Sequence, residues 1–329
     1  MSVFKESLSY RPFTYEWAVV ESKRHSIDMH WDVHQIELLD DLVQYNSKDG
    51  LKTKDVSHET NKYIIEKILC LFTEMDKTVA SGYIRLLPYI KNNEIRTWFL
   101  TAAQRETVHQ RAYALLAETF GFSDRDWRVF SEYAEMKDKL DVMVASELEG
   151  RDEFKACVLL STILLGEGIG LFGAFASLLN YKRQGLLMGF NDVNSWSILD
   201  EQVHVDTNIK VLNEMRKELT DEENQELNRL IKKIIKKYVK AEDKFIELIF
   251  KLGELQDLTK EQLIGYIDYL GEFRTWQLGL IKKVTKKNPL DWMSWMLTGA
   301  KHDAFFEKRV TEYVHRKLSG TINYDKYKS

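Results

Sequence analysis

Residues 157–179 read CVLLSTILLGEGIGLFGAFASLL, an apolar run with a single carboxylate, Glu167, near its middle. About 20 apolar residues suffice to span a bilayer, so a membrane helix has to be weighed. A carboxylate at that depth would cost several kcal/mol in lipid unless it had a partner. Four glycines surround Glu167, and glycines allow close packing against other helices. We therefore expect the most buried helix of a bundle and no membrane span.

The overall composition favours long amphipathic helices. Only 3 prolines and 16 glycines occur among 329 residues, while 44% of the residues are hydrophobic and 30% are charged. Pro breaks helix interiors and Gly weakens them, so this composition argues against repeated hairpins and β-sandwiches. The 47 Lys and Arg against 51 Asp and Glu give a formal net charge of −4, which offers no electrostatic argument for nucleic-acid binding.

The hydrophobic pattern predicts successive helices from residue 58 to residue 316, with short breaks at 91–93, 121–124 and 150–152. Residues 213–260 are dense in Lys and Glu around an apolar stripe, as expected for a helix with one solvated face. No linker divides the chain. We expect one helical domain over 1–318, less regular over 1–57, and a flexible tail over 319–329.

The N-terminus and the cysteines bear on the compartment. Residues 1–11 are polar and lack the apolar stretch of a secretion signal. Cys70 and Cys157 both lie in apolar helical surroundings, which indicates buried, reduced thiols. These features predict a cytoplasmic protein.

Three Glu-x-x-His motifs could supply metal ligands: Glu106 with His109, Glu201 with His204, and Glu312 with His315. Residues three apart share a helix face, so each motif can offer a carboxylate oxygen and an imidazole nitrogen to one ion. Spacing within the motif does not choose among the three.

The first two motifs differ from the third because an acidic residue lies at a suitable distance before each of them. Asp76 lies 30 residues before Glu106, and Glu167 lies 34 residues before Glu201. Both intervals fit an antiparallel helix hairpin, and two such hairpins would place four carboxylates and two imidazoles at one level of a four-helix bundle. Ferritin-like di-iron and di-manganese proteins use this ligand set. Glu312 lacks such an acid and stands among basic residues, so we expect a surface helix end there.

Two acids and one tyrosine need separate weighing. Glu167 cannot be solvated within an apolar helix, so it must be neutral, paired or bound to metal. Glu74 lies two residues from Asp76, and on spacing alone a register error would exchange them. Tyr113 lies four residues after His109 on the same helix face, where a dimetal site could oxidise it. Packing in a helical core is the alternative role for this tyrosine.

Six segments make the chain similar to the radical-generating small subunit of class I ribonucleotide reductase over residues 10–318. They are FTEMDKTVASGY (72–83), KNNEIR (91–96), RETVHQRAYALL (105–116), GEGIGLF (166–172), WSILDEQVH (196–204) and FFEKRVTEY (305–313). The resemblance implies an all-α fold, with a ferritin-like four-helix bundle around a dimetal site and additional helices outside it.

The resemblance also implies a role for each candidate residue. The metal ligands that the resemblance implies are Asp76, Glu106, His109, Glu167, Glu201 and His204. It favours Asp76 over Glu74, because the family's first ligand is the Asp of the FTxxD pattern. Tyr113 takes the position of the stable radical. Trp31 resembles the tryptophan on the electron route, and Asp200 resembles the aspartate that orients the ligand imidazole and couples it to that tryptophan.

The activity implied is that of a ribonucleoside-diphosphate reductase. A reduced dimetal site activates O2 and oxidises Tyr113, and the radical passes to a large subunit that reduces ribonucleotides to deoxyribonucleotides. The chain has two cysteines, fewer than the three needed for a thiyl radical and a reducing thiol pair, and no P-loop or GxGxxG turn. The nucleotide chemistry therefore belongs to that partner. The family further implies a homodimer and two metal ions per chain, with iron expected and manganese or a mixed pair also compatible.

The sequence departs from the family's pattern at two places. The tail that would dock the large subunit is short, with Tyr324 and Tyr327 as the only candidates for a relay tyrosine. Leu171 stands where many members have a phenylalanine near the radical, while Phe175 keeps an aromatic ring one turn further on.

Two other functions fit the same ligand set. One is a related dimetal oxidase or oxygenase that acts on a lipid or small apolar substrate, which would need a tunnel to the metals. The other is a ferritin-like iron store or a helical interaction protein, neither of which needs Trp31 or Asp200.

Overall fold

The computed structural model of the chain describes residues 2–6, 13–123 and 149–296, together with positions 125, 126, 133, 135, 137 and 141. The described part is built from helices, so the expected all-α class is confirmed. The helices are α1 (Glu16–Lys23), α2 (Leu39–Asn46), α3 (His58–Leu86), α4 (Asn93–Thr119), α7 (Asp152–Gly168), α8 (Phe172–Arg183), α9 (Met188–Met215), α10 (Asp221–Ile249) and α11 (Lys260–Gln277). Short turns of π-helix (Arg24–Asp28) or 3-10 helix (Val33–Gln35, Arg216–Glu218 and Asp291–Met296) complete them.

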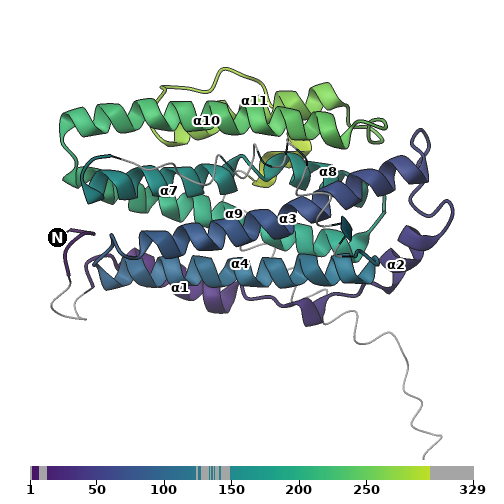
Figure 1. Cartoon of the computed structure of the whole chain (residues 1–329), viewed down its shortest axis with the longest axis horizontal. Coiled ribbons are helices and arrows are strands. Elements are labelled where there is room, and N and C mark those ends of the chain that lie inside the picture. Colours follow the sequence, from purple (N-terminus) through teal and green to yellow (C-terminus); the bar gives the residue numbers. More distant parts are fainter. Residues whose placement is uncertain are drawn as a thin grey trace, which may run out of the picture.

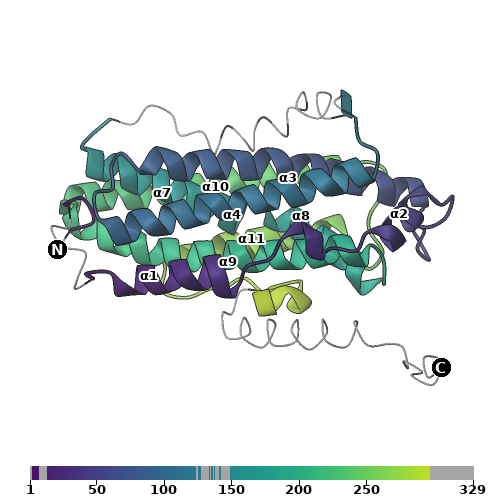
Figure 2. The same ribbon diagram turned by 90° about the horizontal axis from the view of Figure 1, so that it is seen from below.

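Four long helices form the centre of the molecule. α3 packs along α4 and α7 along α9, and the two pairs meet through α3 against α7 and α4 against α9. α10 and α11 form an outer layer over α7 and α8 (Figure 1). On the opposite side, α1 packs against α4 (Figure 2). The predicted hairpins are therefore present, although the second includes α8 between its two partners.

Local signals explain where the first hairpin begins and turns. The side chain of Ser57 accepts a hydrogen bond from the backbone N–H of Thr60 at the start of α3, and Asn92 caps α4 in the same way through Ile95. Pro88 lies in the turn between the two helices, where it disrupts no helical hydrogen bond. Two of the predicted breaks, 91–93 and 150–152, end at the first residues of α4 and α7, and the described residues of the third, 121–123, follow the end of α4.

The apolar run around Glu167 differs from the expectation of one helix. Asp152–Arg183 is the one stretch among the described residues that is long and apolar enough to cross a membrane, and it is wholly buried in the protein. It is interrupted at residues 169–171, between α7 and α8. The carbonyl of Gly168 accepts a hydrogen bond from Nε of Arg274 at 3.0 Å, which satisfies a group left free at the helix end.

The glycines of this run allow the outer layer to approach closely. A Cβ atom at Gly170 would lie 2.9 Å from the carbonyl oxygen of Gly166 and 3.3 Å from the Tyr238 ring on α10. At Gly173 it would lie 2.5 Å from Oε2 of Glu242, which accepts a hydrogen bond from the Gly173 N–H. A side chain at either position would therefore push α10 away from the bundle.

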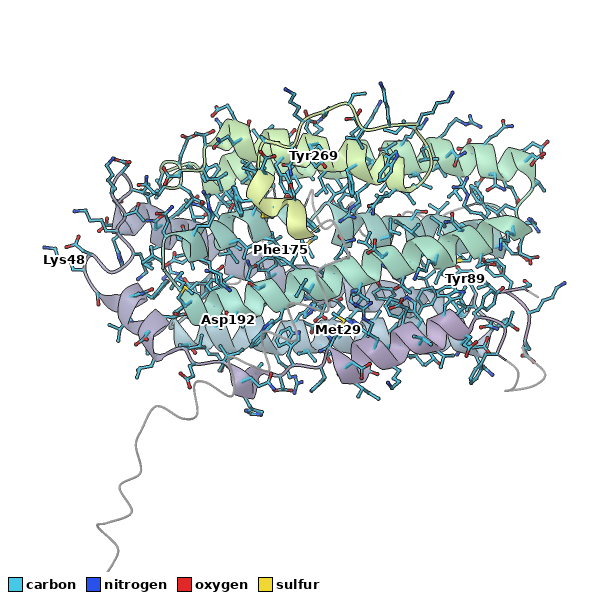
Figure 3. All side chains as sticks on the ribbon, turned by 180° about the vertical axis from the view of Figure 1, so that it is seen from behind. Met29, Lys48, Tyr89, Phe175, Asp192 and Tyr269 are labelled. Atoms are coloured by element: carbon cyan, nitrogen blue, oxygen red, sulfur yellow. The ribbon has the colours of Figure 1, made fainter. Side chains whose placement is uncertain are left out.

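The outer helix α10 has the predicted solvated face. Its buried positions Leu227, Ile231 and Ile235 recur every four residues, and the lysines between them face outward. Thr220 and Glu223 form a capping box at its start. Figure 3 shows that apolar and charged side chains are also separated elsewhere in the protein: Phe175 lies between helices, and Lys48 lies on the outside.

Candidate metal centre

Six polar side chains meet inside the bundle. All six are buried, and every helix of the central four contributes: Asp76 from α3, Glu106 and His109 from α4, Glu167 from α7, and Glu201 and His204 from α9. The structure thus brings together all the residues that were predicted as ligands.

The six residues form two overlapping clusters. Asp76, Glu106, His109 and Glu201 offer donor atoms that all lie within 4.8 Å of one another. Glu106, Glu167, Glu201 and His204 form a second group with the same property. Glu106 and Glu201 belong to both clusters, so their carboxylates stand between two positions for a cation.

Each histidine turns Nδ1 toward the carboxylates. Nδ1 of His109 lies 3.4 Å from Glu106 and 3.2 Å from Glu201. Nδ1 of His204 lies 3.1 Å from Glu106 and 3.0 Å from Glu167. One imidazole therefore serves each cluster.

The polar atoms of the clusters lack ordinary partners. Among the described residues, Oδ2 of Asp76, both carboxylate oxygens of Glu106 and of Glu201, and Nδ1 of His109 are buried without a hydrogen bond. Unsatisfied buried polar atoms are rare and costly, and here they converge. A pair of cations would satisfy them, and the mixed oxygen and nitrogen donors suit iron or manganese. The residues therefore fit a dimetal centre.

The pKa values describe how the metal-free site balances its charges. Burial raises the pKa of Glu167 to about 8, although His204 opposes the shift. Burial also raises the pKa of Asp76 well above its usual range, and the Glu106 carboxylate adds to it. Burial alone would lower the pKa of His109, but the negative charge of Glu106 and the hydrogen bond to Asp200 outweigh burial and raise this pKa. Without metal, the site retains protons that bound cations would displace.

Asp200 links the first cluster to Trp31. Its Oδ2 accepts a hydrogen bond from Nε1 of Trp31 at 2.8 Å and one from Nε2 of His109 at 3.1 Å. The His109 proton on Nε2 leaves Nδ1 available to a metal. The Trp31 and His109 rings stack with centroids 5.7 Å apart. The predicted triad of Trp31, Asp200 and His109 is thus assembled.

Arg105 provides the positive charge that balances Asp200. Its Nε lies 3.5 Å from Oδ2 of Asp200, and both side chains are buried. Burial alone would raise the pKa of Asp200, but Arg105 and the hydrogen bond from His109 hold it well below its usual range. Arg105 was not among the predicted residues, although it directly precedes the predicted ligand Glu106.

Replacing Asp200 by Asn should destabilise the metal-free protein by about 3–5 kcal/mol, because the Arg105 guanidinium stays buried without its counter-charge. Urea unfolding followed by circular dichroism measures the loss. Asp206→Asn on the same helix is the control, since Asp206 is only half-buried and accepts a hydrogen bond from Gln202. Equal losses in the two variants would contradict the argument.

His25 joins the second cluster to Asp200 and was not among the residues predicted from the sequence. Its Nε2 lies 2.8 Å from Nε2 of His204, and its Nδ1 lies 3.6 Å from Oδ1 of Asp200. Burial lowers the pKa of His25 well below its usual range, so the ring is neutral and can accept the His204 proton at Nε2. Asp200 thus contacts one ligand histidine directly and the other through His25.

A second chain of hydrogen bonds reaches Glu167 and was also missed. The Tyr83 hydroxyl lies 2.8 Å from each oxygen of Glu167. Nδ2 of Asn208 donates to the Tyr83 hydroxyl at 2.7 Å, and Nε1 of Trp98 donates to Oδ1 of Asn208 at 2.9 Å. Spacing could have identified two of these residues. Tyr83 lies seven positions after Asp76, and Asn208 lies four positions after His204, each on the ligand face of its helix.

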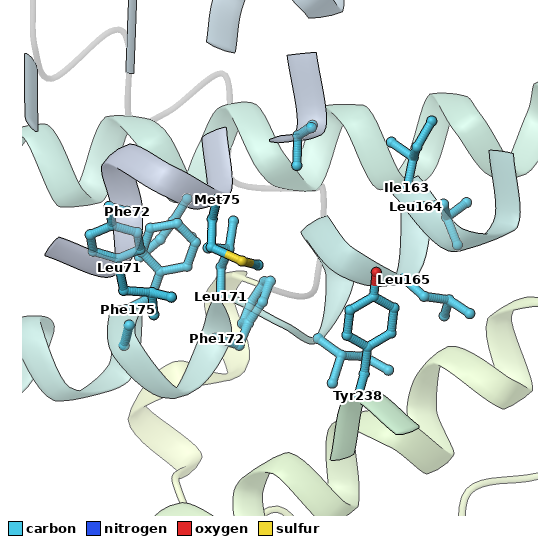
Figure 4. Close-up of a cluster of buried hydrophobic side chains, with 14 of the residues drawn as sticks. Leu71, Phe72, Met75, Ile163, Leu164, Leu165, Leu171, Phe172, Phe175 and Tyr238 are labelled. Carbon is cyan, nitrogen blue, oxygen red and sulfur yellow. The ribbon is translucent and has the colours of Figure 1, made fainter. Parts of the chain in front are cut away.

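Tyr113 lies in an apolar part of the core. Its ring stacks on Phe72 with centroids 4.5 Å apart, and Phe72 stacks on Phe175 at 4.9 Å. Figure 4 shows Phe72, Phe175 and Leu171 in one hydrophobic cluster, so Leu171 and Phe175 both contribute to this region. Burial raises the pKa of Tyr113 well above its usual range, and the Asp76 carboxylate adds to it.

The remaining candidates fall outside the centre. Glu74 is half-buried and pairs with Lys77 at 2.6 Å, so Asp76 and not Glu74 belongs to the cluster. Glu312, His315, Tyr324 and Tyr327 lie outside the described residues.

Comparisons with known proteins agree on one family. The family model described as "Ribonucleotide reductase, small chain" matches residues 7–289. A probable ribonucleoside-diphosphate reductase small subunit of Invertebrate iridescent virus 3 is 27% identical over 339 aligned positions, covering 97% of this chain and 88% of that protein. A ribonucleoside-diphosphate reductase subunit beta of Chlamydia pneumoniae is 24% identical, covering 92% of this chain and 88% of its own length.

Solved structures share the fold. The ribonucleotide reductase R2 subunit of Clostridium botulinum superposes with a TM-score of 0.74 at 16% identity, covering 91% of this chain and 94% of that structure. The dimanganese(II)-NrdF of Streptococcus sanguinis superposes with a TM-score of 0.73 at 14% identity, covering 90% of this chain and all of that structure.

Proposed function

This chain belongs to the ribonucleotide reductase small-chain family, and we propose that it generates a radical on Tyr113 for use by a large subunit. The observation that carries the proposal is the pair of overlapping clusters that share Glu106 and Glu201, with a buried phenol on the same helix as Glu106. The family membership gives the overall reaction. The geometry supports the residues assigned to it.

Six residues would hold the metal pair: Asp76, Glu106, His109, Glu167, Glu201 and His204. When bound, the pair supplies the electrons that reduce O2 and the oxidising power that acts on Tyr113. The protein's own part is to exclude water, since Tyr113 is 1% exposed and aromatic and aliphatic side chains surround it. A phenoxyl radical in such surroundings meets no solvent reductant.

Trp31, Asp200 and His109 form the proposed route between the metals and the partner. Asp200 holds Nε1 of Trp31 and Nε2 of His109 on the same oxygen, so a proton can move along the hydrogen bonds while an electron moves between the stacked rings. We assign Tyr324 and Tyr327 of the tail as candidates for the relay to the large subunit. We also expect a homodimer.

Iron is the metal we expect, and manganese or a mixed pair fits the same donor atoms. The similar fold of the dimanganese(II)-NrdF of Streptococcus sanguinis supports manganese as an alternative. Metal analysis with EPR on protein from its native host separates these forms.

Two cavities on the described surface give little support to the alternative of an oxidase acting on an apolar substrate. A cavity of about 620 Å³ is lined by residues such as Arg24, Asp206 and Trp276, and one of about 340 Å³ by residues such as Glu74 and Phe122. None of the six candidate ligands lines either of them. A substrate channel to the metals is therefore not found in these two cavities.

The proposal is tested by reconstitution. Metal-free protein is loaded with Fe(II), with Mn(II) or with both, exposed to O2, and assayed for reduction of a ribonucleoside diphosphate with and without the large subunit. We expect deoxyribonucleotide only when the metal, O2 and both chains are present. Turnover of an apolar substrate by this chain alone, without reductase activity in the complete mixture, would favour the oxidase.

A further inference from the structure

We infer that Tyr83 is a second site of one-electron oxidation in this chain, placed at the cluster opposite to that of Tyr113. This inference rests on the proposed function, because it needs the dimetal centre oxidised by O2 as the oxidant. The evidence is the position of the Tyr83 hydroxyl, which contacts the carboxylate of a candidate ligand directly.

The proton of Tyr83 has an acceptor within reach. Its hydroxyl lies 2.8 Å from each oxygen of Glu167, and a carboxylate bound to metal through one oxygen keeps the other for this hydrogen bond. Oxidation of Tyr83 would transfer one electron to the oxidised metal centre and the hydroxyl proton to Glu167. The O–H bond breaks, a new O–H bond forms on the carboxylate, and the metal centre is reduced by one electron.

Tyr113 lacks such a contact. Among the described residues its hydroxyl has no hydrogen bond of normal geometry. The two phenols therefore differ in one property that can be measured, because a tyrosyl radical that accepts a hydrogen bond has a different electronic g-tensor from one that does not. The radical on Tyr83 should also be short-lived, since the proton stays on Glu167 next to the phenoxyl oxygen.

A chain of contacts leads from Tyr83 to the residues of the proposed route. Asn208 bridges Tyr83 and Trp98 by hydrogen bonds. The Trp98 ring lies 5.8 Å from the His25 ring, and Nδ1 of His25 lies 3.6 Å from Asp200. Tyr83, Trp98 and His25 are all buried, so these contacts are shielded from bulk solvent. Tyr83 is thereby connected to Asp200, which holds Trp31.

The test uses rapid freeze-quench and high-field EPR on the metal-loaded Tyr113→Phe protein mixed with O2. We expect a transient tyrosyl radical with the g-tensor of a hydrogen-bonded phenoxyl and with a proton coupling that disappears in D2O. Adding Tyr83→Phe should reduce this signal to that of the metal-free control. Adding Tyr181→Phe should leave the signal unchanged, because the buried Tyr181 hydroxyl donates its hydrogen bond to Asn61 and not to a carboxylate.

The other possible outcomes distinguish a failure of the role of Tyr83 from a failure of the proposed function. A wild-type protein that forms a radical while the Tyr113→Phe protein forms none overturns the role of Tyr83 and leaves the proposed function standing. A tyrosyl radical that survives in the Tyr113→Phe/Tyr83→Phe protein also overturns it. Absence of any radical in wild type refutes the proposed function and this inference together. If the double variant fails to hold two metals, the exchangeable proton coupling in the single variant decides.

Discussion

Replacing Tyr113 by Phe should abolish the long-lived tyrosyl radical and bring ribonucleotide reduction down to the level of the metal-free protein. The phenol is the one group of Tyr113 that can be oxidised at accessible potential, and Phe keeps the ring that stacks on Phe72. The proposed electron route through Trp31 and Asp200 stays intact in the variant. The effect on activity should therefore be all-or-none.

The same change should cost little stability. The Tyr113 hydroxyl is buried and has no hydrogen bond of normal geometry among the described residues. Removing a buried polar group without a partner is nearly neutral or slightly stabilising. Thermal unfolding of the metal-free variant should thus match that of wild type, and metal analysis should still find two ions per chain.

Tyr266→Phe is the matched control. Tyr266 is also fully buried, and its hydroxyl also lacks a hydrogen bond of normal geometry within the described part of the chain, but it lies on the outer helix α11. This variant should keep both radical and activity. EPR of samples held after mixing with O2 measures the long-lived signal. A signal that persists unchanged in Tyr113→Phe would remove the radical from this residue.

The candidate ligands could be predicted because helices impose short-range rules. A spacing of three puts Glu106 and His109 on one face, and the intervals of 30 and 34 residues fit the return path of a hairpin. Burial of Glu167 followed from the apolar run around it. The choice of Asp76 over Glu74 needed the family resemblance, and the structure agrees, since Glu74 faces Lys77 at the surface.

The missed residues are those that depend on contacts between distant segments. His25 reaches Asp200 from the less regular N-terminal part, about which helical periodicity says nothing. Trp31 lies in the same part and was predicted only through the family resemblance. The break after Gly168 depends on Arg274, 106 residues later in the chain, which satisfies the free carbonyl. Helix propensity alone locates such a break only approximately, because any of several glycines in the apolar run could end the helix.

Replacing Glu106 or Glu201 by Ala should remove both metal ions, whereas replacing Glu167 by Ala should remove one. Glu106 and Glu201 supply a donor atom to each cluster, while Glu167 belongs only to the cluster that contains His204. Loss of a shared carboxylate also leaves two cations facing each other without the negative charge between them. Coulomb repulsion at a few ångströms in a buried site then opposes binding of the second ion.

The three variants should therefore differ both in the number of metal ions that they bind and in how much metal stabilises them. An ion present at about 100 times its Kd adds about 2.7 kcal/mol to folding, so two ions bound at independent sites would add about twice that amount. Metal should raise the unfolding temperature of wild type most, that of Glu167→Ala about half as much, and those of the shared-carboxylate variants least. Metal analysis of desalted protein gives the matching counts of two, one and none.

Glu74→Ala is the control for these variants, because Glu74 lies two residues from Asp76 but outside both clusters. It should retain two ions and the full thermal shift. Circular dichroism of each metal-free variant verifies that the helices form before metal is added. If Glu167→Ala still binds two ions, the second cluster does not depend on Glu167, and the contact of Tyr83 with that carboxylate loses its link to the metals. If Glu106→Ala retains one ion, the two positions are independent and the carboxylate between them is not shared.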